Sequence, residues 1–249
     1  MAITRVGLVT LATGTNTGWT CAIPTVLDND VLFAFLAKRA NAAPTLPAGQ
    51  GYVLLDPADS STTAITQWCY ATVLQAADSA TNHVWAWASA TAGASALILR
   101  GVDTATLLDV ADPPAGGTAN STSVACPAST APNPGDWVLR ATATAANATH
   151  TFPATLDGNA YTREVGATAG ACGLARAEYP TAGAVSAMTA TFSLTGRCVG
   201  KTLVVRPAGL GPVTQRWSGS AWVPATVRRW DGSQWLVVQP KRWTGTGWY

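Results

Sequence analysis

The sequence predicts an all-β protein: a jelly-roll-like β-sandwich of two similar halves, followed by a short tail of β-hairpin repeats. Three observations lead to this prediction. Short apolar runs bounded by Gly, Pro, Asn and Asp recur through the first 206 residues, as is typical of strands separated by turns. No segment combines helical apolar spacing with a preceding capping residue. Two internal repeats, with spacings of 106 and 13 residues, divide the chain.

Strands are predicted where Val, Leu, Thr and aromatic residues cluster. These runs are Arg5–Leu11, Asp30–Lys38, Gly51–Leu55, Ala64–Leu74, His83–Ala88, Ser95–Arg100, Trp137–Thr144, Ala187–Leu194 and Thr202–Arg206. Large apolar side chains in them contribute about 1.5–3 kcal/mol each when buried. We therefore expect an interior that includes Leu32, Phe33, Phe35, Trp85 or Trp87, Leu97, Leu99, Trp137, Leu139, Phe192, Leu203 and Val205.

The weaker repeat relates two halves, about 1–106 and 107–206. Residues 30–48 align without gaps to residues 136–154, and 97–100 align to 203–206 at the same offset. Two halves of about four strands would make one sandwich of roughly eight, the size of a jelly roll.

The same offset predicts which residues are equivalent. Asp30 and Asp136 should occupy matching positions about an approximate twofold, and so should Arg100 and Arg206. The segment Pro113–Pro134 is rich in Ala, Gly, Ser, Thr and Pro, and is predicted to connect the halves.

The tail carries the stronger repeat. After a short linker at 207–212, residues 213–249 contain three units with the pattern Arg-Trp-x-Gly-(Ser/Thr)-x-Trp, each 13 residues after the last. The Ser-Gly, Asp-Gly and Thr-Gly pairs favour tight hairpin turns. These units hold six of the 11 tryptophans, Trp217, Trp222, Trp230, Trp235, Trp243 and Trp248, preceded by Arg216, Arg229 and Arg242.

The repeat predicts an interaction element rather than a catalyst. An isolated hairpin is marginally stable in water, and each indole can bury about 150–250 Å². Contiguous apolar surface of that size marks interaction sites, so we expect the three hairpins to stack and to serve oligomerisation or docking. Basic residues beside tryptophans also suggest nucleic acid or polysaccharide. Cross-strand packing of guanidinium on indole is the preferred interpretation, and no nucleic-acid partner is expected.

Catalytic chemistry has little support in the sequence. Charged residues make up 11% of the chain and the net charge is +2. The histidines, His83 and His150, lack metal-ligand spacing, and no nucleophile elbow or phosphate-binding loop is present. Asp28-Asn29-Asp30 is interpreted as a turn rather than a calcium site, and Asp103 as a loop residue that pairs with Arg100. No enzyme activity, catalytic residue, cofactor or metal is predicted.

Cysteine usage and the N-terminus indicate where the protein assembles. The five cysteines are scattered, odd in number and without CxxC spacing, so they are predicted to be small buried residues of a protein folded in a reducing cytoplasm. We expect no signal peptide, because the N-terminus lacks a basic region followed by a long apolar run. No run approaches the 18 apolar residues typical of a membrane span.

Four short stretches resemble a known family when taken in order. They are residues 29–35 (NDVLFAF), 46–49 (LPAG), 99–103 (LRGVD) and 134–139 (PGDWVL). In this order, and with the Arg-Trp-Asp-Gly-Ser-x-Trp tail, the chain is similar to minor tail proteins of bacteriophages that infect actinobacteria. The sequence departs from the family pattern at Asn29, where Gly is usual, and at Gln50, where Trp is usual.

The resemblance implies a structural protein of the virion, at the tail or tail tip, assembled in the host cytoplasm. It also implies partners: other copies of the chain, with a trimer as one expected form, other tail proteins, and host cell-wall glycan at the cell surface. Two alternatives stay open at this point. One is a carbohydrate-binding module, since a β-sandwich with exposed aromatic residues is a common platform for sugars. The other is a capsid decoration or spike protein.

Overall fold

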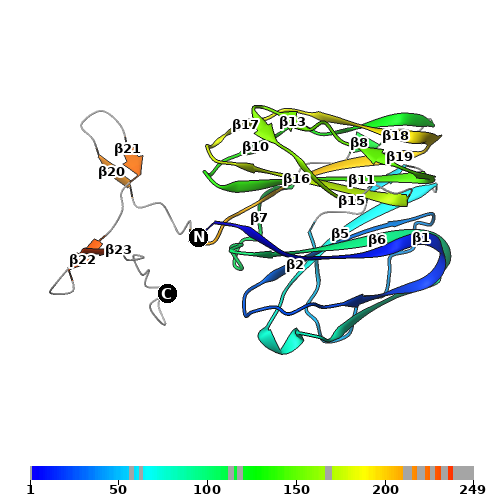
Figure 1. Ribbon diagram of the computed structural model, residues 1–249, viewed down its shortest axis with the longest axis horizontal. Coiled ribbons are helices and arrows are strands. Elements are labelled where there is room, and N and C mark those ends of the chain that lie inside the picture. Colours follow the sequence, from blue (N-terminus) through cyan, green and yellow to red (C-terminus); the bar gives the residue numbers. More distant parts are fainter. Residues whose placement is uncertain are drawn as a thin grey trace. The chain divides into compact units, whose positions relative to one another are not determined.

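A computed structural model describes residues 2–55, 59–61, 64–111, 115–116, 120–165 and 170–209, and the strand residues 215–217, 222–224, 228–230 and 235–237. The chain divides into a sandwich unit, Met1–Ala208, and a Trp-repeat unit, Gly209–Tyr249. Regular structure in the described residues consists of antiparallel β-strands and one 3-10 turn. The predicted all-β class is therefore confirmed (Figure 1).

The first half of the sandwich unit is organised around a six-stranded sheet. Its order is β1-β6-β2-β5-β3, with β4 also pairing with β5. Three register shifts interrupt the β1–β6 pairing, and such bulges bend a strand pair. The far end of this hairpin covers one face of the sheet (Figure 1). The elements are β1 (Thr4–Ala22), β2 (Val31–Lys38), β3 (Val53–Leu54), β4 (Asp59–Ser61), β5 (Ile65–Val73), the turn η1 (Ala76–Asp78) and β6 (Asn82–Arg100).

The second half has a sheet of the same size, in the order β15-β16-β11-β19-β7, with β8 also pairing with β19. These strands are β7 (Leu108–Ala111), β8 (Ala115–Gly116), β11 (Asp136–Ala148), β15 (Thr162–Val165), β16 (Gly170–Tyr179) and β19 (Cys198–Val205). A second layer covers its outer face, formed by the sheet β12-β18-β9 and the pairs β10-β17 and β13-β14. Its strands are β9 (Ser121–Cys126), β10 (Ser129–Ala131), β12 (His150–Thr151), β13 (Thr155–Leu156), β14 (Asn159–Ala160), β17 (Gly183–Val185) and β18 (Met188–Gly196).

Two expectations about strands need correction. The runs at 83–88 and 95–100 belong to one continuous strand, β6, rather than to two. The segment at 113–134 is more than a connection, since it contributes β8, β9 and β10. In β9 the strand signal is hidden because small and polar residues replace the usual large apolar ones. The backbone of β9 packs closely against Gly200 of β19. A Cβ added at Gly200 would come within 2.4 Å of the Ala125 carbonyl oxygen.

Strand order and register repeat between the halves. The strands β7, β19, β11, β16 and β15 hold the places that β1, β6, β2, β5 and β3 hold in the first sheet. Val31 pairs with Leu99, and Trp137 with Val205, both 106 residues later. The turn before each central strand contains a positive φ, 70° at Asn29 and 86° at Gly135. Equivalent segments of the two halves thus adopt equivalent structures.

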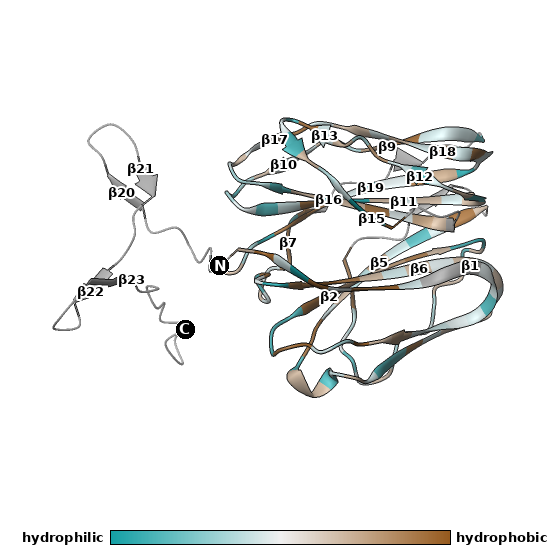
Figure 2. Ribbon diagram, viewed as in Figure 1, coloured by the Kyte–Doolittle hydropathy of each residue, from teal (hydrophilic) through white to brown (hydrophobic). Residues whose placement is uncertain are grey.

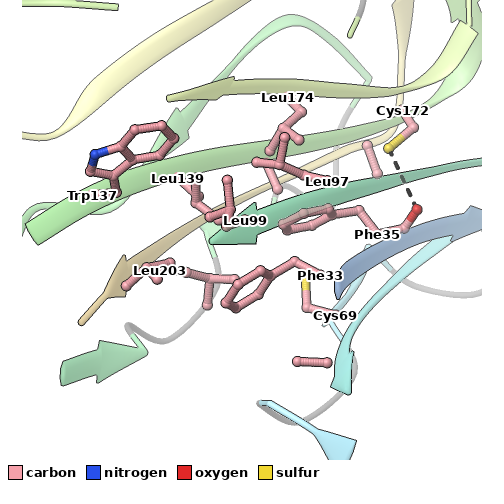
Figure 3. Packing of buried hydrophobic residues seen from close by; sticks show 14 of the residues in the cluster. Phe33, Phe35, Cys69, Leu97, Leu99, Trp137, Leu139, Cys172, Leu174 and Leu203 are labelled. Carbon is pink, nitrogen blue, oxygen red and sulfur yellow. Dashed lines mark hydrogen bonds between the residues drawn. The ribbon is translucent and has the colours of Figure 1, made fainter. Parts of the chain in front are cut away.

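Each half is itself a two-layered sandwich, so the molecule is not a single sandwich of about eight strands. The main sheets of the two halves pack face to face across a central core (Figure 3). Phe33, Phe35 and Leu97 come from the first half, and Trp137 and Leu203 from the second. Alternate residues of the same strands, such as Leu32 and Ile98, face a separate core on the outer side.

The predicted interior is confirmed residue by residue. Every side chain named for it is buried, including both Trp85 and Trp87. Figure 2 shows polar and apolar residues alternating along several strands. Strands of the central sheets are buried on both faces, however: all eight residues of β2 are buried, and so are all eight of β19. Near-continuous apolar runs are the expected signature of such strands.

Candidate interaction sites

The Trp-repeat unit contains two of the predicted hairpins. β20 (Gln215–Trp217) pairs with β21 (Trp222–Pro224), and β22 (Arg228–Trp230) pairs with β23 (Trp235–Val237). Both hairpins have the same backbone register, in which the first Trp of the motif pairs with the second. The pairs are Trp217↔Trp222 and Trp230↔Trp235, flanked by Arg216↔Val223 and Arg229↔Leu236. The third unit, with Arg242, Trp243 and Trp248, lies outside the described residues.

A groove of about 700 Å³ opens between the two halves of the sandwich unit. Sequence reasoning did not single out any of its residues. Its wall is closely packed at Gly196, where an added Cβ would lie 2.9 Å from the Ala146 backbone nitrogen. Each half contributes one arginine to the lining, which comprises Arg39, Ala64, Asn120, Ala145, Ala146, Thr195, Gly196 and Arg197.

In the first half, the equivalent charged residues Asp30 and Arg100 form an ion pair with a structural role. Asp30, at the start of β2, receives two hydrogen bonds from the Arg100 guanidinium, each 2.8 Å long. It also accepts the Leu27 backbone N–H at 2.8 Å. The bidentate pair joins the turn before β2 to the end of β6, and it holds the pKa of Arg100 above its ordinary value, chiefly through the hydrogen bonds that Arg100 donates to Asp30. Arg100 therefore does not pair with Asp103, contrary to the sequence prediction.

The second equivalent pair is arranged differently. Asp136 accepts the Asn133 backbone N–H at 2.9 Å, which repeats the first-half turn. Arg206 lies 3.4 Å from Asp103 and 3.6 Å from Asp109. Burial, together with the nearby Asp109 carboxylate, raises the pKa of Asp136 to about 7 against the opposing effects of the hydrogen bond from Asn133 and the charge of Arg206. The second half thus holds two carboxyl groups close together, where the first has an ion pair.

The two histidines are buried in separate halves and serve packing. His83 Nδ1 lies 2.7 Å from the Tyr52 hydroxyl, and burial lowers the pKa of His83. His150 Nδ1 lies 2.8 Å from the Thr142 hydroxyl, and its ring meets Phe192 edge-on. Neither position resembles an exposed general base.

Residues considered as metal ligands are engaged with the protein. Asp28 accepts the Ala76 backbone N–H at 2.7 Å, and Asp30 is held by Arg100. Across the described part of the chain, no group of three or more His, Cys, Asp or Glu residues is placed to hold a metal ion. All five cysteines are buried, as predicted, and none of them forms a disulfide. Burial raises the pKa of Cys21 to about 12, and of Cys126 and Cys172 to about 11.

A buried arginine in the second half also has a structural explanation. Arg140 is fully buried in β11. It donates hydrogen bonds of 2.6 Å to the carbonyl oxygens of Pro127 and Ser186, and another to the Thr202 hydroxyl. These bonds join the outer layer to the main sheet, so this charge is used for folding rather than for a ligand.

Searched over the described residues, the structure has no helix long and apolar enough to cross a membrane. Compared with known proteins, the chain matches no family model, no curated sequence and no solved structure.

Proposed function

We propose that the chain is a non-enzymatic structural protein of a bacteriophage virion, located at the tail or tail tip. In this proposal the sandwich unit is a rigid scaffold. The Trp-repeat unit docks it to other copies of the chain or to other tail proteins, and adhesion to the host surface is a further role of the assembled particle.

One observation carries the proposal. The Trp-repeat unit is separate from the sandwich unit, and its two described hairpins share one register that pairs the two tryptophans of each motif. Strands of three residues have too few partners to be stable alone, so stability requires packing between repeats or on a partner. A polar ligand site would not require such repetition.

The scaffold role rests on the sandwich unit. Its main carboxylates are engaged by arginines or backbone N–H groups, and its histidines are buried. Face-to-face packing of two sandwiches buries three stacked layers of apolar side chains, which favours rigidity over conformational change.

The direct test is to locate the protein in a particle. Antibodies raised against the purified chain should decorate the tail or tail tip of the encoding phage in immunogold electron microscopy, and the chain should be found in purified virions by mass spectrometry. Labelling of the capsid shell would instead identify a decoration or spike protein. Absence from purified virions would exclude a structural role.

A further inference from the structure

We propose that the groove between the halves binds a ligand bearing a carboxylate or phosphate group on a polar chain, through Arg39 and Arg197. The inference is independent of the virion role proposed above. The groove's volume of about 700 Å³ is large enough for a ligand of several linked units, since ligand clefts typically measure about 300–1,000 Å³.

The two arginines are held in place by equivalent backbone hydrogen bonds. Arg39 follows β2, and its N–H donates to the Thr91 carbonyl oxygen at 2.9 Å. In the second half the Ala145 N–H donates to the Arg197 carbonyl oxygen at 2.8 Å, at the same offset of 106 residues. Each half thus fixes one arginine at the groove. A guanidinium presents paired donors that match carboxylate and phosphate oxygens.

Neither guanidinium has an ionic partner in the described part of the chain, whereas Arg5, Arg100 and Arg176 each contact a carboxylate. Arg197 Nη1 is also shielded from water and meets no hydrogen-bond acceptor among the described residues. A buried donor without an acceptor is energetically costly. A ligand oxygen would remove that cost. Residues 62–63 and 117–119, which adjoin Ala64 and Asn120 in sequence, contain no Asp or Glu.

The remaining lining indicates what the anionic group is attached to. Asn120 and Thr195 provide an amide and a hydroxyl, which suit the hydroxyl groups of a sugar or polyol. The described lining contains no aromatic residue on which a nucleobase would stack, and such stacking contributes much of the affinity for single-stranded nucleic acid. An anionic saccharide or polyol phosphate fits these features better than a nucleic acid does.

Isothermal titration calorimetry on the full chain tests this proposal with trigalacturonate, glycerol 3-phosphate and neutral glycerol as probes. At least one anionic probe should bind, and glycerol should not. Arg39→Gln and Arg197→Gln should each weaken binding about tenfold or more, equivalent to about 1.4 kcal/mol. Combining the two substitutions should abolish binding.

Arg163→Gln is the matched control, because Arg163 is exposed and does not line the groove; it should bind as the unsubstituted chain does. Circular dichroism verifies that each variant is folded. If Arg197→Gln does not fold, Arg197→Lys retains the charge and should bind more weakly than the unsubstituted chain. The proposal is overturned if neither anionic probe binds, or if the double variant binds unchanged. Either result leaves the virion role intact, because that role is tested by locating the protein in particles.

Discussion

At single positions, the duplicated halves place the same type of residue in different electrostatic surroundings. Asp30 and Asp136 begin equivalent strands, and each accepts a backbone N–H from three residues earlier. Asp30 is held by the Arg100 guanidinium. At Asp136, burial raises the pKa more than the positive charge of Arg206, which lies near Asp103 and Asp109, lowers it. The result is a carboxyl group that favours its protonated form in the folded protein.

This difference predicts a pH dependence of stability. The pKa of Asp136 is raised from 3.8 to about 7, so the folded state holds a proton that the unfolded chain releases between these values. The stabilising contribution is complete below about pH 4 and is lost as pH rises through about 7. The Tm should therefore fall between pH 5 and pH 8, and Asp136→Asn should flatten that slope.

Asp28→Asn provides the control for this experiment, since Asp28 is an exposed aspartate in the corresponding region of the first half. It should leave the slope of Tm against pH as it is in the unsubstituted protein. A slope that persists in Asp136→Asn would show that another group is responsible.

A second residue-scale prediction concerns Gly173 in β16. An added Cβ would lie 2.5 Å from His150 Nδ1 and 2.7 Å from the Thr142 hydroxyl oxygen. Gly173→Ala should therefore lower the free energy of unfolding by about 2 kcal/mol, as overpacking of a filled core does. Gly183→Ala, where nothing lies within 4 Å of the added atom, should change it by less than about 0.5 kcal/mol. Equal effects in denaturant unfolding would contradict the packing argument.

At the scale of elements, one ion-pair network ties an edge strand of each main sheet together. Glu164 on β15 lies 2.9 Å from Arg5 on β1 and also pairs with Arg176 on β16. The Arg176 guanidinium in turn lies 4.3 Å from the centre of the Trp137 ring. The Glu164 side chain is 1% exposed, although the Arg5 side chain is 42% exposed. Glu164 is thus buried, whereas its partner Arg5 is exposed to water.

The network predicts unequal effects of its members. Glu164→Gln should lower the free energy of unfolding by about 3 kcal/mol, because it deprives Arg176 of a buried counterion. Arg5→Gln should cost less than about 1 kcal/mol, since an exposed partner is screened by water. Urea unfolding of both variants measures the difference. Losses of similar size would contradict the argument that the buried end of the network contributes more to stability than the exposed end.

At the level of the whole molecule, the chain divides into two units. The sandwich unit ends at Ala208, and the core residues that the structure describes all precede that point. Truncation after Ala208 should therefore leave a folded protein whose Tm lies within about 2 °C of the full chain, as expected for an independent domain. Light scattering should show that the full chain self-associates and that the truncated chain does not.

The same truncation distinguishes docking from sugar binding. If the shortened protein retains its oligomeric state and its place in the particle but loses glycan binding, the Trp repeats are a sugar site. Failure of the truncated chain to fold would contradict the independence of the two units.

The all-β class, the interior residues and the repeats could be predicted from the amino-acid sequence, because they depend on local periodicity and on turn chemistry. Phe33, Phe35, Leu97 and Leu203 could be assigned to the interior because each lies in an apolar run. The pattern in β9 was missed, since Ala, Ser and Thr become interior residues only where a neighbour such as Gly200 permits close approach.

How the halves combine depends on long-range packing and became evident from the folded structure. Local patterns show that a strand buries one face or both, but not which sheet covers it, so the packing of two sandwiches across one shared core was not predictable. The same is true of the charged residues. Arg206 lies against Asp103 and Asp109, and Arg39 and Arg197 line one groove, because residues far apart in the chain were brought together by that packing.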